Sequence, residues 1–167
     1  MVELSRFLSI PIPHYIECLD ISNLYKQDVV AGFLVFINGE KDLTKSKLYK
    51  LNITEPANDL ARIRAVCIIH YQKHLPSAMP DLIIVDGGKE QVKVVQQVLQ
   101  ELGMKRAVIG LVKDERHQTA KVAFSTGKEL SFEKEEKIKN FLTNCQAEVH
   151  RYALNFHRKL HRRSTFR

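Results

Sequence analysis

The chain has 167 residues, of which 44% are hydrophobic and 27% are charged, and its formal net charge is +7. This length and this apolar share are typical of one globular domain with its own core. The sequence holds no internal repeat, no low-complexity tract and no Gly/Ser linker, so nothing in it marks a domain boundary. The positive charge favours an acidic partner such as nucleic acid, although charge says nothing about the fold.

The positive charge is concentrated towards the C-terminal end. Residues 144–167 hold one acid, Glu148, against six basic residues: Arg151, Arg158, Lys159, Arg162, Arg163 and Arg167. The difference of six and one means that this segment supplies +5 of the net +7. A run of this kind is often only a solvated helix face, so the charge alone leaves a DNA-binding face and a plain surface equally open.

Three cysteines, Cys18, Cys67 and Cys145, lie far apart in apolar surroundings, and none belongs to a C-x-x-C pair. This spacing predicts buried free thiols in a reducing compartment. The N-terminus lacks the charged-then-apolar pattern of a signal peptide, and no run is long and apolar enough to cross a bilayer. We therefore expect a cytoplasmic protein.

The first part of the sequence predicts an antiparallel meander behind a short lead-in. We expect residues 1–13, which close on two prolines, to lead into one domain over residues 14–167. Apolar and alternating runs predict three strands, over residues 14–20, 29–37 and 45–53. Asn38-Gly39 marks the turn between the second strand and the third.

The remainder predicts helices alternating with strands. Helical spacing of apolar residues predicts helices over residues 60–70, 91–102 and about 133–162, the first capped by Asn58 or Asp59. Strands are predicted over residues 81–86 and 106–113, with a possible hairpin over 118–130 that turns at 125–127. This order predicts an α/β protein with a mixed five-stranded sheet flanked by helices, as in the RNase H-like fold, although other α/β folds begin in the same way.

Two acids stand where such a sheet is expected to bind ligands. Asp20 and Asp86 each end a predicted strand, and ligands gather at the carboxyl ends of parallel strands. Gly87-Gly88 allows a sharp turn beside the second acid. A single acid at a strand end is often only a helix cap, but two acids on neighbouring strands repel each other unless a cation lies between them. Oxygen ligands suit Mg²⁺ or Mn²⁺, and such an ion favours phosphodiester hydrolysis.

Three histidines, His150, His157 and His161, share one face of the last predicted helix. His150 and His157 lie roughly 10.5 Å apart along the helix axis, which is too far for two ligands of one metal. His157 and His161 have zinc-like spacing but no evident third ligand, so phosphate contact is the preferred interpretation. Taken alone, His150 is more often a half-buried surface histidine than a ligand.

Three segments of the chain resemble the C-terminal RNase H-like endonuclease domain of UvrC, the nuclease subunit of bacterial nucleotide excision repair. They are residues 16–22 (IECLDIS), 80–91 (PDLIIVDGGKEQ), and 148–153 (EVHRYA) running into 157–160 (HRKL). Their order and spacing also fit, and the similarity spans about residues 14–163. The second and third segments together are too specific for a chance match.

The resemblance implies that Asp20, Asp86 and His150 form the Asp-Asp-His triad of that family. They would hold Mg²⁺ or Mn²⁺, with His150 as a third ligand or as a base that orients water. The resemblance also implies an incision 5′ to a lesion in damaged double-stranded DNA, with UvrB as a partner and UvrA upstream in the pathway. The same match predicts that six residues contact DNA without reading bases: Lys89, Gln91, Arg151, His157, Arg158 and Lys159.

The chain departs from the family pattern in two places. Asn23 stands where the family usually has His, and Gln146-Ala147 replaces an Arg-Asp pair, which removes a charge pair beside the triad. No segment resembles the family's GIY-YIG nuclease or its helix-hairpin-helix pair, so we expect an excised domain or a shortened relative with feeble activity alone. The alternative is a catalytically weak or inactive module that binds DNA or a repair partner. An endonuclease V-like or resolvase-like enzyme is disfavoured by residues 87–89 and 150–152.

Overall fold

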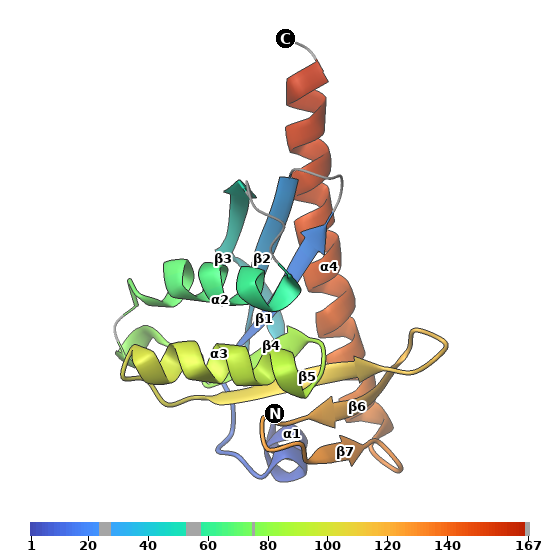
Figure 1. Ribbon diagram of the computed structural model, residues 1–167. Helices are drawn as coiled ribbons and strands as arrows, with labels where there is room; N and C mark the ends of the chain where they lie inside the picture. Colours follow the sequence, from blue (N-terminus) through green and yellow to red (C-terminus); the bar gives the residue numbers. More distant parts are fainter. Residues whose placement is uncertain (24–27, 53–57, 75, 166–167) are drawn as a thin grey trace.

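The computed structural model describes the backbone of residues 1–23, 28–52, 58–74 and 76–165, and it leaves the side chains of 23, 28, 52, 76, 157 and 159–165 undescribed. Its elements follow one another as shown in Figure 1. The helices are α1 (Val2–Leu8), α2 (Asp59–Tyr71), the short 3-10 turn η1 (Pro76–Ala78), α3 (Lys89–Glu101) and α4 (Glu136–Thr165). The strands are β1 (Tyr15–Asn23), β2 (Asp28–Ile37), β3 (Glu40–Asn52), β4 (Leu82–Asp86), β5 (Ala107–Lys113), β6 (Thr119–Ala123) and β7 (Glu129–Ser131).

One mixed sheet organises the described chain, with the strand order β3-β2-β1-β4-β5-β6-β7. Strand β1 pairs antiparallel with β2 and parallel with β4, and β4 pairs parallel with β5. The α/β class and the mixed sheet are confirmed, but the predicted count of five strands is too low. The possible hairpin is real, and it joins the sheet because β6 pairs with the open edge of β5 and β7 extends it.

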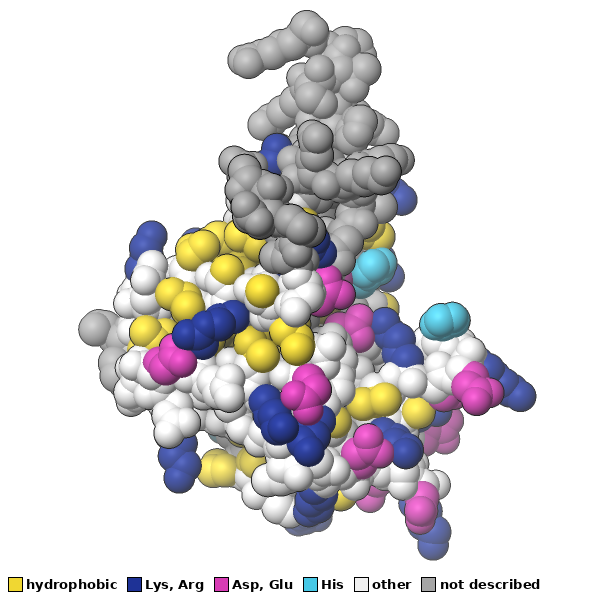
Figure 2. Space-filling model, viewed as in Figure 1, with side chains coloured by type: hydrophobic (Ala, Val, Ile, Leu, Met, Phe, Trp, Pro, Cys, Tyr) yellow, Lys and Arg dark blue, Asp and Glu magenta, His cyan; other side chains and the backbone are white. Residues whose placement is uncertain are grey.

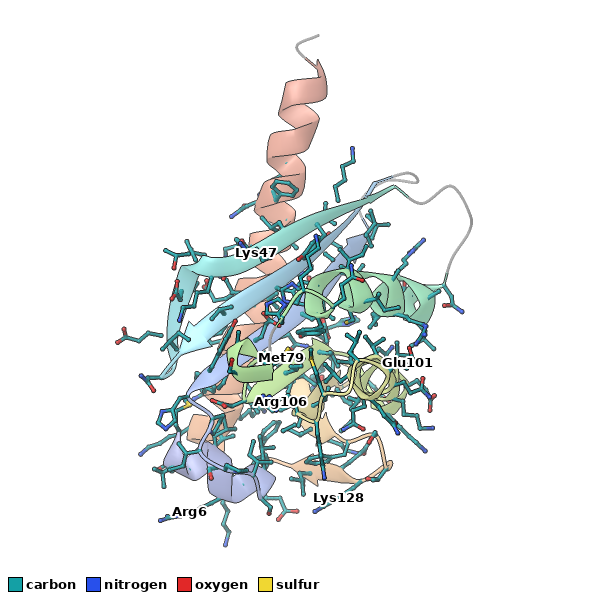
Figure 3. All side chains as sticks on the ribbon, turned by 90° about the vertical axis from the view of Figure 1, so that its left-hand side faces the viewer. Arg6, Lys47, Met79, Glu101, Arg106 and Lys128 are labelled. Carbon is teal, nitrogen blue, oxygen red and sulfur yellow. The ribbon has the colours of Figure 1, made fainter. Side chains whose placement is uncertain are left out.

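The helices cover both faces of the sheet, as predicted. Figure 3 shows α2 and α3 on one side of the strands and α4 on the other. The apolar stripe of α4 packs on β1 and β2 through Leu142, Cys145 and Val149, all buried. Because successive strand residues face opposite sides, Cys18 packs against α4 while Leu19 packs against the helices of the other face. The side chain of Asp20 therefore faces α4.

The first thirteen residues include a helix that the sequence analysis did not predict. Leu4 and Leu8, four residues apart, are both buried in the core layer under α4. Ser9 ends the helix in the left-handed conformation, with φ of 55°. The predicted boundary of the domain at residue 14 stays a prediction, since only the packing of α1 is observed.

Two smaller expectations can be compared with the structure directly. Asn58 caps α2, its side-chain oxygen accepting from the amide of Ala61 at 2.8 Å. The three cysteines are free and buried, as predicted.

Strand β3 begins at Glu40, earlier than predicted, because its charged residues pair with β2 directly after the Asn38-Gly39 turn. Within the described residues, no helix combines the length and the hydropathy that a membrane span needs.

Candidate active site

The structure brings Asp20 and Asp86 to the same edge of the sheet. Strands β1 and β4 run parallel, and their last paired residues are Leu19 and Val85. Each acid comes directly after that pair. Asp86 ends β4, whereas Asp20 lies where the pairing of β1 with β4 stops, three residues before β1 ends at Asn23. The predicted end of the first strand at Asp20 was therefore too early, but the two acids still meet at the edge where the parallel strands separate, which is where the sequence predicts a ligand site.

The two acids share one cavity of about 250 Å³. It lies between the ends of β1 and β4 and the helices α2 and α3. Apolar residues form much of the wall, and Gln91 adds a polar group from the first turn of α3. The cavity is thus small and partly apolar, and both acids belong to its lining.

Asp20 is the more buried of the two acids, with only 7% of its surface exposed. Burial raises the pKa of its carboxyl group, and the negative charge of Asp86 raises it further. A hydrogen bond from His150 and the positive charge of Lys113 lower the pKa but do not cancel the effect of burial. The carboxylate of Asp20 is therefore held in surroundings that disfavour its charge unless a cation is near.

His150 reaches Asp20 from α4, on the face of the sheet opposite α2 and α3. Its Nδ1 lies 2.9 Å from Oδ2 of Asp20, although 130 residues separate them in the sequence. The ring is largely open, with 56% of the side chain exposed. Because an ionised carboxylate can only accept a hydrogen bond, Nδ1–H of His150 donates to Asp20, which favours the imidazole tautomer whose Nε2 carries a lone pair.

Asp86 is held by two side chains that the sequence analysis did not assign to the site. Lys113, the last residue of β5, donates from Nζ to Oδ2 at 2.8 Å. Gln146 donates from Nε2 to Oδ1 at 2.7 Å, and its own Oε1 accepts from the hydroxyl of Thr119 at 2.6 Å. Lys113 ends a strand that the sequence predicted, but the parallel pairing of that strand with β4, which brings the lysine to Asp86, is seen only in the structure. Gln146 stood out only as a departure from the family pattern.

Glycines shape the turn after Asp86. Gly87 has φ of +146°, and a Cβ at Gly110 of the neighbouring strand would lie 2.3 Å from the carbonyl oxygen of Gly87. A side chain at Gly110 would thus push the turn away from β5. Gln91 accepts from the amide of Gly88 at 3.0 Å and fixes the start of α3 beside the acid.

The other residues predicted to contact DNA are scattered around this site. Lys89 is exposed and extends beside the turn at Gly127, while Gln91 lines the cavity itself. Arg151 is exposed and forms an ion pair with Glu148. Arg158 is exposed further along α4, and the side chains of His157 and Lys159 lie outside the described part of the chain.

The triad residues are therefore brought together, but not as three ligands around one point. Among the residues that the structure describes, no group of three His, Cys, Asp or Glu side chains is arranged to hold one metal ion. The arrangement consists of an acid and histidine pair, Asp20 with His150, beside a second acid, Asp86, that is already paired with a lysine. Such a set can orient an imidazole base and present two carboxylates to a cation.

A sheet of this order, with two acids where its adjacent parallel strands separate, is the arrangement of the RNase H-like fold. The model of one family, the UvrC RNase H endonuclease domain, matches residues 5–154. The chain belongs to that family. This confirms the resemblance seen in the three sequence segments.

Known relatives agree with this assignment. The UvrABC system protein C of Finegoldia magna is 35% identical over 157 residues, which cover 89% of this chain and 26% of that protein. The UvrABC system protein C of Ureaplasma parvum serovar 3 is 34% identical over 166 residues, covering 98% of this chain and 28% of that protein. The chain thus spans about a quarter of the length of the curated relatives it matches.

Solved structures with a related shape include endonuclease V. The catalytic domain of human endonuclease V has a TM-score of 0.45 and 13% sequence identity, covering 76% of this chain and 64% of that one. Endonuclease V of Ciona intestinalis, in complex with DNA that contains an inosine, has a TM-score of 0.43 and 12% identity, covering 68% and 56%. Likenesses at this level establish no correspondence between active sites.

Proposed function

We propose that this chain is a divalent-metal-dependent endonuclease domain that hydrolyses a phosphodiester of damaged double-stranded DNA. The observation that carries the proposal is the meeting of Asp20 and Asp86 in one cavity, with His150 bonded to the first acid. Family membership supports the same chemistry. The site residues proposed are Asp20, Asp86 and His150.

The donor set suits a hard divalent cation. Asp20 is buried, its pKa is raised by that burial, and the charge of Asp86 adds to the effect, so a cation between the acids would relieve a repulsion that the fold imposes. Carboxylate oxygens are the preferred ligands of Mg²⁺ and Mn²⁺. Asp20 and Asp86 would hold the ion, with His150 beside them. When bound, such an ion supplies an acidified water and offsets charge on the phosphate.

The chain's own side chains supply the proton transfer and the positioning. Asp20 keeps the His150 proton on Nδ1, so Nε2 is free to accept a proton from a water molecule at the mouth of the site. Gln146 and Lys113 fix both oxygens of Asp86. Lys113 also brings a positive charge to the place where a phosphate would enter, and this charge favours the developing negative charge of the reaction.

DNA contacts are proposed for the exposed groups around this centre. Lys89 and Arg158 are exposed, and Arg151 is exposed beside its partner Glu148. Together with Gln91, His157 and Lys159, they complete the set predicted from the family resemblance. Contacts from such groups go to phosphates and carry no base specificity, which suits a nuclease that acts on lesions in any sequence.

The role in the cell is proposed from the relatives, of which this chain spans about a quarter. Relatives carrying the name UvrABC system protein C support an incision 5′ to the lesion in nucleotide excision repair. The partners would be damaged DNA and UvrB, with UvrA acting upstream. Free buried cysteines fit the cytoplasmic location expected from the sequence.

One observation favours a second candidate, a catalytically weak or inactive DNA-binding module. Asp86 is already paired with Lys113 and Gln146, so its charge is partly neutralised without a metal. A cation would have to compete with the lysine for this carboxylate. The two candidates differ in whether metal binding and cleavage depend on the acids.

The deciding experiment compares the wild type with the Asp20→Asn/Asp86→Asn variant on ultraviolet-irradiated supercoiled plasmid, with Mn²⁺ or Mg²⁺, and with UvrA and UvrB supplied. We expect metal-dependent nicking by the wild type and a loss of about 10²- to 10³-fold or more in the variant, since a bound ion contributes several kcal/mol. Calorimetry with Mn²⁺ should show binding by the wild type alone. Equal Mn²⁺ binding by both proteins, or DNA binding without any nicking, would favour the inactive module.

Gln146 provides a prediction about the positioning of Asp86. Replacing it by Leu removes the hydrogen bond to Oδ1 but keeps a similar volume in the buried site. Because partners of this kind orient a metal-binding carboxylate, we expect Mn²⁺ affinity or nicking to fall by about 10- to 100-fold. Gln146→Glu is the matched variant, which can still accept from Thr119 but cannot donate to Asp86 when ionised.

The readout for Gln146 is the dependence of nicking on Mn²⁺ concentration. A positioning role predicts that higher Mn²⁺ partly restores the rate of Gln146→Leu. Loss of stability alone would instead appear in the thermal unfolding midpoint and would not respond to the metal. Wild-type Mn²⁺ dependence in both variants would show that the contact with Asp86 has no positioning role.

A further inference from the structure

A second hollow, of about 500 Å³, lies beside the candidate active site on the other side of Asp86. One wall is a stripe of α4 that carries Lys139, Asn140, Thr143 and His150. The facing wall comes from the end of β5 and the turn that follows it, with Lys113 and His117. Figure 2 shows histidine, basic and acidic side chains together on this side of the molecule, where the β5–β6 turn stands next to α4.

The charge of this hollow has one sign. Two lysines and two histidines line it, the other lining residues are neutral, and no acid is among them. Acids outside the lining bond to two of these groups, Asp86 to Lys113 and Asp20 to His150, and a third acid, Asp114, lies close enough to Lys139 for their charges to interact. Its carboxylate is turned to the backbone, accepting from the amides of Arg116 and Gln118 at 2.9 and 3.0 Å. The hollow is therefore suited to a negatively charged ligand.

The turn that forms one wall is held in place by its own hydrogen bonds. Besides the two amides bound by the side chain of Asp114, the amide of Asp114 donates to the carbonyl of Gln118 at 2.8 Å. His117 adopts a left-handed conformation, with φ of 60°, which is uncommon for a residue other than glycine. Strained residues of this kind persist where the surrounding structure fixes them, and they gather at ligand-binding sites.

The hollow is continuous with the candidate active site. Lys113 lines the hollow and donates to Asp86, and His150 lines the hollow and donates to Asp20. From His150 the α4 wall runs back to Lys139, eleven residues earlier, which is about 16 Å along the helix axis. A DNA duplex rises about 3.4 Å per base pair along its helix axis, so a wall of this length corresponds to roughly five base pairs of duplex lying along α4.

We propose that this hollow binds the sugar-phosphate backbone of the DNA strand that is cut, immediately to one side of the scissile phosphate. The proposal rests on the proposed nuclease function and adds a substrate subsite to it. Lys139 and His117 contact phosphates on opposite walls, and Asn140 and Thr143 offer neutral hydrogen bonds to phosphate or sugar oxygens. None of these residues was assigned to DNA from the sequence.

The shape of the hollow favours a strand backbone over other anions. Its α4 wall extends from Lys139 to His150 and its facing wall carries Lys113 and His117, whereas a site for a single small phosphate gathers its donors around one point. Contacts from lysine, asparagine and threonine to the backbone carry no base preference. The hollow therefore sets the position of the strand relative to Asp20 and Asp86, not the sequence that is cut.

The test measures DNA binding apart from cleavage. Every protein carries Asp86→Asn, which prevents cleavage. Binding to a fluorescently labelled duplex with a single-stranded bubble is measured by anisotropy at about 50 to 200 mM salt. In a plot of log binding constant against log salt concentration, each phosphate contact contributes roughly 0.9 to the slope. Lys139→Ala is expected to weaken binding about 3- to 10-fold at the low end of that range and to lower the slope by about 0.7 to 0.9. His117→Gly, which keeps the left-handed backbone, is expected to weaken it less.

The matched control is Lys47→Ala, which removes an exposed lysine from β3, at the opposite edge of the sheet from β7 (Figure 3). Thermal melts establish that all variants are folded. A Lys139→Ala protein with the affinity and slope of Lys47→Ala overturns the proposal, as does a parent protein that does not bind the duplex at all. A smaller salt-dependence slope for Lys139→Ala supports the subsite even if the wild type does not nick DNA. Nicking by the wild type together with an unchanged slope for Lys139→Ala supports the nuclease function but not the subsite.

Discussion

The Asp20→Asn variant is expected to unfold at a higher temperature than the wild type when no metal is present, while losing cleavage. Burial raises the pKa of Asp20, so the folded state carries a charge that its surroundings disfavour. Asparagine removes the charge but still accepts the hydrogen bond from Nδ1 of His150. Stabilising changes at such sites are worth about 0.5–2 kcal/mol, which corresponds to a shift of roughly 2–4 °C per kcal/mol for a chain of this size.

The pH dependence gives this prediction a definite sign. Because the pKa of Asp20 is raised on folding, the folded state binds more protons than the unfolded state as the pH rises from the ordinary pKa of an aspartate to the raised one. The stability contributed by this group is present below that window and is lost through it. The difference in unfolding midpoint between Asp20→Asn and the wild type should therefore be small in acid and should grow towards neutral pH.

Adding Mn²⁺ should reverse the order of the two proteins. A ligand that binds only the folded state raises the unfolding midpoint of the protein that can bind it, and that is expected to be the wild type. Asp42→Asn serves as a matched control, since the pKa of Asp42 is lowered by its hydrogen bond with Thr44 and the change should not stabilise the fold. A wild type that is more stable than Asp20→Asn without metal at neutral pH would contradict the account given for Asp20.

The second large effect is expected at Glu17, a buried acid outside the candidate active site. Only 1% of Glu17 is exposed, and its two carboxylate oxygens accept from Nε2 of His70 at 3.0 Å and from the hydroxyl of Tyr71 at 2.7 Å. The hydroxyl of Tyr49 lies 2.9 Å from Nδ1 of His70, and the ring of Phe33 stacks on that histidine. Burial and Glu17 raise the pKa of Tyr71, which therefore stays protonated and donates.

Glu17→Ala is expected to lower the free energy of unfolding by about 3–5 kcal/mol, because it leaves the buried partners of the carboxylate without an acceptor. At roughly 2–4 °C per kcal/mol, the fall in unfolding midpoint should exceed 6 °C. Chemical denaturation followed by circular dichroism measures the change. Glu17→Gln, which keeps an acceptor oxygen of the same reach, should lose less.

The control for this network removes its three fully buried polar groups together. In Glu17→Leu/His70→Phe/Tyr71→Phe the hydroxyl of Tyr49 loses its partner, but the buried donors that Glu17→Ala leaves without an acceptor are gone, so the triple variant should be more stable than Glu17→Ala. A cost below about 1 kcal/mol for Glu17→Ala would mean that water satisfies the network, and that the hydrogen bonds described here add little to stability.

The site residues that could be predicted are those whose position follows from the pattern of apolar residues in a strand or helix. Asp20 and Asp86 were found because each ends an apolar run, and parallel strands bring such ends to one edge. His150 was found from the resemblance and lies on the apolar-striped helix that packs across β1. The structure brings these three residues together, although it does not arrange them as three ligands of one ion.

Partners of the site could not be found in this way. Whether Gln146 contacts Asp86 or solvent depends on the rotation of α4 about its own axis against the sheet. The pattern of apolar residues in α4 defines this rotation only to within a residue or two. Lys113 reaches Asp86 because β5 lies parallel beside β4, a pairing that the sequence does not specify. The side chains around a charged group are selected by packing among elements distant in sequence.

The sequence by itself determined the order and type of most elements, the two acids at strand ends, and the concentration of positive charge in the last helix, because these follow from local periodicity and composition. Only the tertiary structure decided that the hairpin extends the sheet to seven strands, that Glu17 is buried among hydrogen-bond donors, and that a basic hollow runs up to the acids. The physical reason is that strand neighbours, burial and electrostatic partners are properties of distant segments packed together, and no local stretch of sequence contains them.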